Sequence, residues 1–203
     1  MLIKIHSAQQ PSNQRGITLV ELMVGLAILG GLLAMAAPFA GQMITNAKIR
    51  TAAESILSGL QLARSSAVNQ NVPVQFVLNN TLTESSWYVG CVSPSTTAPV
   101  CPAVIQARSG VEGTTQVMVA SNITPVAFSG FGALTTATAA ALTAVPATTV
   151  NICVGIAGMT SNSASAFSSC SNPLERRLWV SVTSSGSIRM CDPALSQPDP
   201  QAC

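Results

Sequence analysis

Charged and aromatic side chains are scarce in this chain. Charged residues make up 8% of its 203 residues and aromatic residues 4%, so a highly charged, helix-rich cytosolic protein is not indicated. Of nine basic residues, Lys4 and Arg15 precede residue 17, and the other seven are matched by seven acidic residues. A chain starting there has no strongly basic field to attract nucleic acid. Alanine, serine, threonine and valine dominate instead, which favours β-structure and loops.

Histidine is almost absent as well. The one histidine, His6, lies before the hydrophobic segment, so a chain starting near Ile17 would contain none. This excludes histidine-based triads, general bases and metal ligands from such a chain. The sequence also lacks a glycine-rich phosphate loop and a G-x-S-x-G motif. We therefore expect no enzyme activity, no cofactor and no metal site.

Cysteine is present in a pattern that favours disulfides. No two cysteines form a C-x-x-C pair, which argues against zinc, and an even number in an exported chain indicates disulfide bonds. Proximity in sequence suggests the pairs Cys91–Cys101, Cys153–Cys170 and Cys191–Cys203. Six cysteines allow 15 pairings, so other connectivities remain open, and buried free thiols are the alternative.

A long uncharged run lies near the N-terminus. Leu22 to Ala47 contains 26 residues without a charge, and a helix of that length rises about 39 Å. That exceeds a hydrocarbon core of about 30 Å. Arg15 precedes the run, so the positive-inside rule predicts a cytoplasmic N-terminus and an exported remainder. We therefore predict a single-pass inner-membrane protein with a periplasmic C-terminal domain.

An ordinary secretory signal peptide is the competing interpretation. The small residues at Ala34 to Ala37 resemble a signal-peptidase site. Two features argue against cleavage there. Glu21 interrupts the boundary between the basic region and the apolar core, and the low-charge run continues through Phe39, Met43 and Ile44 into a helical pattern.

The segment "RGITLVEL" resembles the processing site of type IV prepilins and type II secretion pseudopilins. In that family a prepilin peptidase cuts after the glycine, here Gly16, and the new terminus, here Ile17, is N-methylated. A glutamate stands at the fifth mature position, which is Glu21. Glycine and proline are frequent at two later positions, matched here by Gly30 and Pro38. Isoleucine in place of the usual phenylalanine at the first mature position is a departure.

The resemblance supplies a physical account of Glu21. An acid within a membrane segment costs about 2.5 to 3.5 kcal/mol on insertion scales, so it needs a partner. The family implies the amine of Ile17, on the same or a neighbouring subunit, as that partner and as the point that sets register during assembly. A snorkelling acid without a partner is the alternative. Pro38, which lacks an amide hydrogen, predicts a kink or local melting, and Gly30 weakens the helix and permits close helix packing.

The helical pattern continues beyond the uncharged run and then gives way to short β-rich segments. Apolar residues at helical spacing extend the helix to about residue 69, and this amphipathic half is expected to pack on a domain. They are Ile49, Ala53, Ile56, Leu57, Leu60, Ala63, Ala67 and Val68. The predicted parts are a leader 1–16, a transmembrane or filament-core half 17–44, an amphipathic half 45–70, and a globular β-rich domain 71–203.

About seven strands are predicted in that domain. They lie within 73–78, 86–92, 116–120, 125–132, 148–154, 177–183 and 187–191, and the first two are expected to form a hairpin. The candidate core anchors are Phe76, Trp87, Phe128 and Trp179. A loop over 93–102 would be closed by Cys91 and Cys101, and 135–149 and 160–172 are ambiguous.

Two further segments resemble the GspH/FimT pseudopilin family. They are "LQLARSSA" followed by "NVPV" at residues 60–67 and 71–74, and "GSIRMCDP" at 186–193. The resemblance implies an α+β, pilin-like fold: a long N-terminal helix, transmembrane in its first half, packed on an antiparallel β-sheet or sandwich. It implies a minor pilin or pseudopilin, with prepilin peptidase, other pilin or pseudopilin subunits and the inner membrane as partners.

A DNA-binding minor pilin is the alternative function. Some members of the family carry two arginines in the segment that corresponds to 186–193, whereas this chain has Ser187 in place of the first and keeps only Arg189. Arg176 and Arg177 would supplement it, although Glu175 is adjacent. Phosphate binding requires several cations, and solvated surface arginines are the simpler interpretation.

The site of processing can be tested by the intact mass of the protein recovered from membranes. We expect a chain that begins at Ile17 and carries one added methyl group. A chain that begins near Ala37 would instead establish the secretory signal peptide.

Overall fold

The computed structural model describes residues 16–78, 85–97, 100–110, 113–135, 149–155 and 176–203, with the backbone alone for 36–40. Its backbone divides into two compact units, Met1–Gln42 and Met43–Cys203. The ambiguous segments 135–149 and 160–172 lie almost wholly outside the described residues.

One long helix, α1, runs over Leu19–Gln70 and belongs to both units. This agrees closely with the helix expected over residues 17–69. In the first unit every described side chain from Gly16 to Met35 is exposed. No helix in the described part of the chain is both long and apolar enough to cross a membrane. The structure therefore does not confirm the transmembrane span predicted over 17–44.

The second half of α1 buries one face. Its buried apolar residues recur every three or four positions, which places them on one side of a helix. They are Ile49, Ala52, Ala53, Ile56, Leu60, Ala63 and Ala67. Leu57 is only partly buried against this core. Val68 was expected on the same face but is 48% exposed, because it falls just beyond the edge of the buried stripe.

The first sheet contains five strands in the order β3-β2-β1-β5-β6. Their bounds are β1 Val74–Leu78, β2 Trp87–Cys91, β3 Gln106–Arg108, β5 Val126–Phe128 and β6 Leu134–Thr135. Strands β1 and β2 pair antiparallel with Val74 opposite Cys91 and Leu78 opposite Trp87, which confirms the predicted hairpin. Strand β1 also pairs antiparallel with β5. Two short strands, β3 and β6, were not expected from the sequence.

The second sheet contains four strands in the order β4-β7-β8-β9. Their bounds are β4 Met118–Ser121, β7 Val150–Gly155, β8 Leu178–Val182 and β9 Ile188–Cys191. All three pairings are antiparallel. Each of these strands lies within or next to a segment predicted to be a strand.

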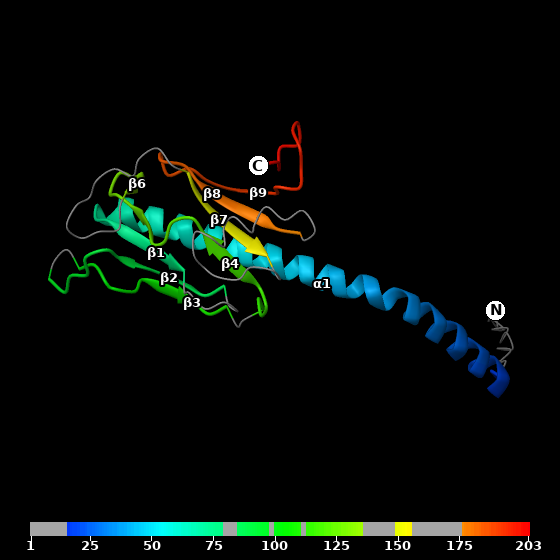
Figure 1. Cartoon of the computed structure of the whole chain (residues 1–203). Helices are drawn as coiled ribbons and strands as arrows, with labels where there is room; N and C mark the ends of the chain where they lie inside the picture. The colour runs from blue at the N-terminus through cyan, green and yellow to red at the C-terminus, as the bar shows by residue number, and fades with distance from the viewer. Residues whose placement is uncertain (1–15, 79–84, 98–99, 111–112, 136–148, 156–175) are drawn as a thin grey trace, which may run out of the picture. The chain divides into compact units, whose positions relative to one another are not determined.

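The second half of α1 shares one hydrophobic core with both sheets. Buried residues of the helix, of β1 and β2, and of β7 and β8 form a single cluster. Figure 1 shows the strands of both sheets running beside this half of the helix. The predicted fold class, an α+β fold with a long helix packed on antiparallel sheets, is confirmed.

The contact between α1 and the first sheet depends on a glycine in the helix. A Cβ atom at Gly59 would lie 2.7 Å from the Phe76 ring and 3.1 Å from the Trp87 ring. These two rings lie with their centroids 5.5 Å apart. The absence of a side chain at Gly59 therefore lets both aromatic anchors approach the helix, and any larger residue would have to displace them.

Three of the four predicted aromatic anchors occupy the main core. Phe76, Trp87 and Phe128 are buried there. Trp179 is not: it is partly buried against a smaller cluster formed by Ala120 and Cys153. The reason is strand alternation, because its neighbours on β8, Leu178 and Val180, point into the main core.

Ser55 provides the polar partner of the buried Trp87. The indole Nε1 donates a hydrogen bond to Ser55 Oγ at 2.8 Å, within the core. We expect Ser55→Ala to lower the free energy of unfolding by about 1 to 3 kcal/mol, because a buried indole N–H loses its acceptor. Chemical denaturation followed by tryptophan fluorescence measures the change.

Ser58→Ala is the matched control on the same helix. Ser58 is exposed, and its hydroxyl donates only to the carbonyl of Ser55 within the helix. We expect a change of less than about 0.5 kcal/mol. Equal effects of the two substitutions would contradict the role assigned to Ser55.

Candidate functional site

Helix α1 begins with a side-chain cap at Thr18. The backbone N–H of Glu21 donates to Thr18 Oγ1 at 3.3 Å, and the N–H of Leu22 donates to the Thr18 carbonyl at 3.2 Å. Thr18 is therefore the N-cap residue, and Glu21 lies three positions later. This is the T-x-x-E arrangement of a capping box. A carboxylate in the first turn also interacts favourably with the positive end of the helix dipole.

The predicted processing residues lie just before this cap. Gly16 and Ile17 are exposed, and both precede the first helical residue, Leu19. Cleavage between them would leave Thr18 and its two hydrogen bonds in the product. The new amine at Ile17 would then lie directly before the N-cap residue.

Large apolar side chains surround the helix after Glu21. Within the first unit these residues are each more than half exposed, and they include Leu22, Met23, Val24, Leu26, Ile28, Leu29, Leu32 and Leu33. A helix that is apolar on every side is stable only when lipid or other helices cover it. Burial of one leucine or isoleucine side chain contributes about 1.5 to 3 kcal/mol, so the driving force for covering this segment is large.

Neither of the two predicted helix-breaking residues interrupts α1 in the single chain. The helix is continuous through Gly30 and Pro38, so the local melting predicted at Pro38 is absent here. A proline removes one hydrogen bond of the helix, and the bonds on either side keep the helix together. A Cβ atom at Gly30 would meet nothing within 4 Å. No contact inside this chain therefore requires glycine at that position.

Two of the three expected disulfides are present among the described residues. Cys91 is bonded to Cys101, with 5.9 Å between their Cα atoms, and Cys191 to Cys203, with 5.1 Å. The first closes the loop after β2, as expected. Cys153 is also disulfide-bonded, but Cys170 lies outside the described residues, so the pair Cys153–Cys170 stays a prediction.

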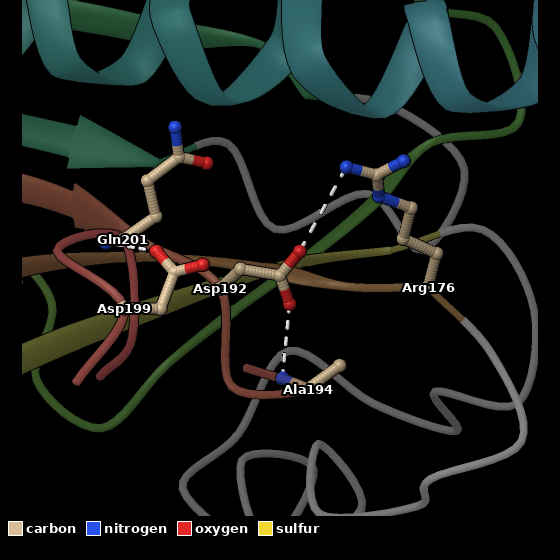
Figure 2. Close-up of polar contacts among 5 residues, drawn as sticks. All are labelled: Arg176, Asp192, Ala194, Asp199 and Gln201. Carbon is tan, nitrogen blue, oxygen red and sulfur yellow. Dashed lines mark hydrogen bonds and ion pairs between the residues drawn. The ribbon is translucent and has the colours of Figure 1, made fainter. Parts of the chain in front are cut away.

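The second disulfide closes a compact loop at the C-terminal end of the chain. The Asp192 carboxylate accepts a hydrogen bond from the Ala194 N–H at 2.9 Å and pairs with Arg176 at 3.8 Å. Asp199 accepts from the Gln201 N–H at 2.8 Å. Figure 2 shows Asp192 between Arg176 and Ala194, with Asp199 and Gln201 in the same loop.

This loop forms one side of a cleft of about 370 Å³. Its charged lining residues are Arg50, Arg176 and Asp192. Arg50 pairs with Glu54 at 2.8 Å and Arg176 with Asp192. Both arginines of the cleft thus already have an acidic partner in the chain.

The three arginines predicted to bind DNA do not form one binding surface. Arg177 is only 3% exposed, and its side chain lies over Gly155, so it cannot reach a phosphate. Arg176 pairs with Asp192, and Arg189 donates to the Cys203 carbonyl at 3.5 Å. Since phosphate binding needs several accessible cations, the DNA-binding alternative is not supported.

Comparison with protein families decides the classification. The description "Type II transport protein GspH" matches residues 52–186, and "Prokaryotic N-terminal methylation motif" matches residues 11–37. The chain belongs to the GspH family. The two matches together support the function of a minor pilin or pseudopilin. They indicate a membrane-anchored protein with a periplasmic domain.

One solved structure of a minor pilin shows the same fold, and that of a minor pseudopilin aligns less closely. The type IV minor pilin FimU of Pseudomonas aeruginosa aligns with a TM-score of 0.50 and 18% identity, covering 78% of this chain and 96% of FimU. The minor pseudopilin EpsH of Vibrio cholerae aligns with a TM-score of 0.46 and 10% identity, covering 73% of this chain and 99% of EpsH. No curated protein matches the chain significantly.

One residue of the candidate site was missed from the sequence. Thr18 caps the helix that carries Glu21. The signal was available, because a threonine followed three residues later by glutamate, before an apolar run, is the pattern of a capping box. The resemblance to prepilins assigns a role to Glu21 and none to Thr18.

Proposed function

We propose that this GspH-family chain is a precursor cut by prepilin peptidase between Gly16 and Ile17, N-methylated at Ile17, and added to a type IV pilus or a type II secretion pseudopilus. The methylation motif over residues 11–37 supports the processing step. The accessible position of Gly16 and Ile17 before the helix is compatible with it.

The proposal rests most on three features that occur together at the start of α1. A capped helix end and a carboxylate in the first turn are followed by a helix with exposed apolar residues on every side. Before assembly, residues 17–44 would span the inner membrane once, with the N-terminus cytoplasmic and the C-terminal domain periplasmic. In a filament, the equivalent segments of other subunits would replace the lipid.

Glu21 would set the register of that assembly. Among the described residues, no basic side chain pairs with it, since the two ion pairs lie elsewhere. Within a bundle of apolar helices, the amine created at Ile17 of a neighbouring subunit is a suitable partner. Such a charge-assisted hydrogen bond is shorter and stronger than a neutral one, and its strength rises when water is excluded.

The role is structural, with other pilin or pseudopilin subunits as partners and no catalytic step. The family and the fold are those of structural subunits. In this proposal, the free energy of assembly comes from covering the apolar surface of the helices. One buried ion pair between neighbouring subunits, from Glu21 to the amine of Ile17, adds to it.

Glu21→Gln and Glu21→Ala test the charge at this position. Glutamine at the third position of a helix maintains a capping box but removes the charge. We expect both variants to be inserted and processed like the parent chain and both to be depleted from purified filaments. Quantitative immunoblotting of membrane and filament fractions measures the ratio.

Thr18→Ala is the matched control, since it removes the cap and keeps the carboxylate. It weakens the helix end by about 1 kcal/mol and should leave incorporation near the parent level. If Glu21→Gln entered filaments normally while Glu21→Ala and Thr18→Ala did not, the cap rather than the charge would explain this glutamate.

A further inference from the structure

An aromatic side chain is presented to solvent at the turn between β5 and β6. Phe131 is 93% exposed, more than any other large apolar residue that the structure describes. It lies in the segment "SGFGA" from Ser129 to Ala133. Exposed single apolar residues are common on protein surfaces, so the surroundings of Phe131 decide whether it has a role.

The turn that carries Phe131 is held in place by several contacts. The Ser129 N–H donates to the Ala133 carbonyl, and the Gly132 N–H donates to the Ser129 carbonyl, both at 2.8 Å. From α1, Arg64 Nε donates to the Gly132 carbonyl at 3.1 Å. Gly132 has a φ of +76°, a conformation that favours glycine. The backbone of the turn is thus fixed on the helix, and Phe131 is held out from it.

Packing around the turn leaves no space for larger residues. A Cβ atom at Gly130 would lie 2.5 Å from Asn71 Oδ1, and one at Gly186 would lie 1.9 Å from the Gly132 carbonyl oxygen. The glycines therefore allow three segments to meet: the turn, the end of α1 and the turn between β8 and β9. Phe131 is therefore an exposed aromatic side chain on a rigid, well-packed turn. Such a side chain is suited to act as a preorganised anchor for binding.

Gly132, the residue after Phe131, lies against a second exposed apolar residue, which lines a cleft. Val68 is 48% exposed, and its Cγ2 atom lies 3.1 Å from the position of a Cβ on Gly132. Val68 also lines a cleft of about 450 Å³. The other lining residues are Gln61, Arg64, Ser65, Asn69, Ser187 and Ile188.

The cleft carries one charge, and that charge is positive. Arg64 is its single charged lining residue, and none of the acidic residues that the structure describes lines it. Since Arg64 Nε is occupied by the Gly132 carbonyl, the two terminal nitrogens of this exposed side chain are the ones left to bind a ligand. That edge matches a carboxylate in a two-bond arrangement. The cleft beside Asp192 differs, because its arginines are already paired with acids.

The position of this surface along the helix argues against a lipid ligand. Val68 lies in the last turn of α1, and about 36 Å of helix rise separates it from Ile44. The surface thus lies at the end of α1 that is distant along the chain from the segment expected in the bilayer. A protein partner at the far end of the domain therefore fits the location.

We infer that Phe131, Val68 and Arg64 form a docking surface for the globular domain of another pilin-like subunit, one that presents an apolar pocket beside a carboxylate. Phe131 fills the pocket, Val68 extends the apolar contact, and Arg64 binds the carboxylate. This inference rests on the proposed function, since it assigns the contact between domains that accompanies packing of the N-terminal helices.

Photo-crosslinking in the producing cells tests the surface in the full-length chain. A benzoyl-phenylalanine replaces Phe131 in one strain and Val104, which is 54% exposed in another part of the domain, in a control strain. We expect the probe at 131 to crosslink a different protein that carries a prepilin-type N-terminal motif, at a residue near an aspartate or glutamate. Absence of an adduct, a lipid adduct or an adduct with a second copy of this chain would each overturn the inference.

Substitutions measure the contribution of each side chain to incorporation into filaments. Phe131→Ala should lower incorporation at least about tenfold, as expected for an anchor residue, with unchanged membrane level and unchanged melting temperature. Val68→Ala should lower it less, and Val104→Ala should not change it. Arg64→Gln and Arg64→Lys both lose the Nε hydrogen bond, but only the lysine variant keeps the positive charge. We expect the lysine variant to be incorporated more than the glutamine variant, and the difference measures the effect of charge.

The two proposals fail in different ways. If the parent chain is itself missing from filaments, the proposed function is wrong. If the parent chain is incorporated and Phe131→Ala is incorporated equally well, the docking surface alone is wrong.

Discussion

The structure depends on one helix whose two halves are covered in different ways. In the second half, a narrow stripe rich in alanine, with Ile49, Ile56 and Leu60, is buried against two sheets. Gly59 lets the Phe76 and Trp87 rings of the first sheet approach the helix backbone. In the first half, large apolar side chains of the described residues are exposed on every side, and we propose that lipid and then other subunits cover them. The second half is thus covered within the chain, whereas the cover proposed for the first half is lipid or other subunits.

The start of the helix joins local structure to the proposed assembly. Thr18 satisfies a backbone donor at the helix end, and Glu21 adds a negative charge in the first turn, where the helix dipole favours it. The same carboxylate has no basic side chain as a partner among the described residues. A local stabilising role and an intermolecular role therefore do not exclude each other. Processing after Gly16 would keep the cap and supply the missing cation.

The sequence predicted those features that depend on local pattern. The helix, the first hairpin, the strands of the second sheet and two disulfides follow from periodicity, turn residues and proximity. Strands β3 and β6 were missed because they are only three and two residues long. The exposed position of Val68, the burial of Arg177 and the outward position of Trp179 depend on how segments pack, which one sequence does not encode locally. Phe131 was likewise placed within a predicted strand, and only the folded turn shows its exposure.

The central claim is that the apolar half of α1 is covered by lipid and then by other subunits. It is tested most directly by labelling Leu29→Cys with a membrane-impermeant maleimide, in intact membranes and in purified filaments. Ser58→Cys, at an exposed position of the same helix within the domain, and the parent chain serve as controls. The account predicts rapid labelling at residue 58 in membranes whose periplasmic face is open, and none at residue 29 in either state. Rapid labelling of residue 29 in filaments would contradict it.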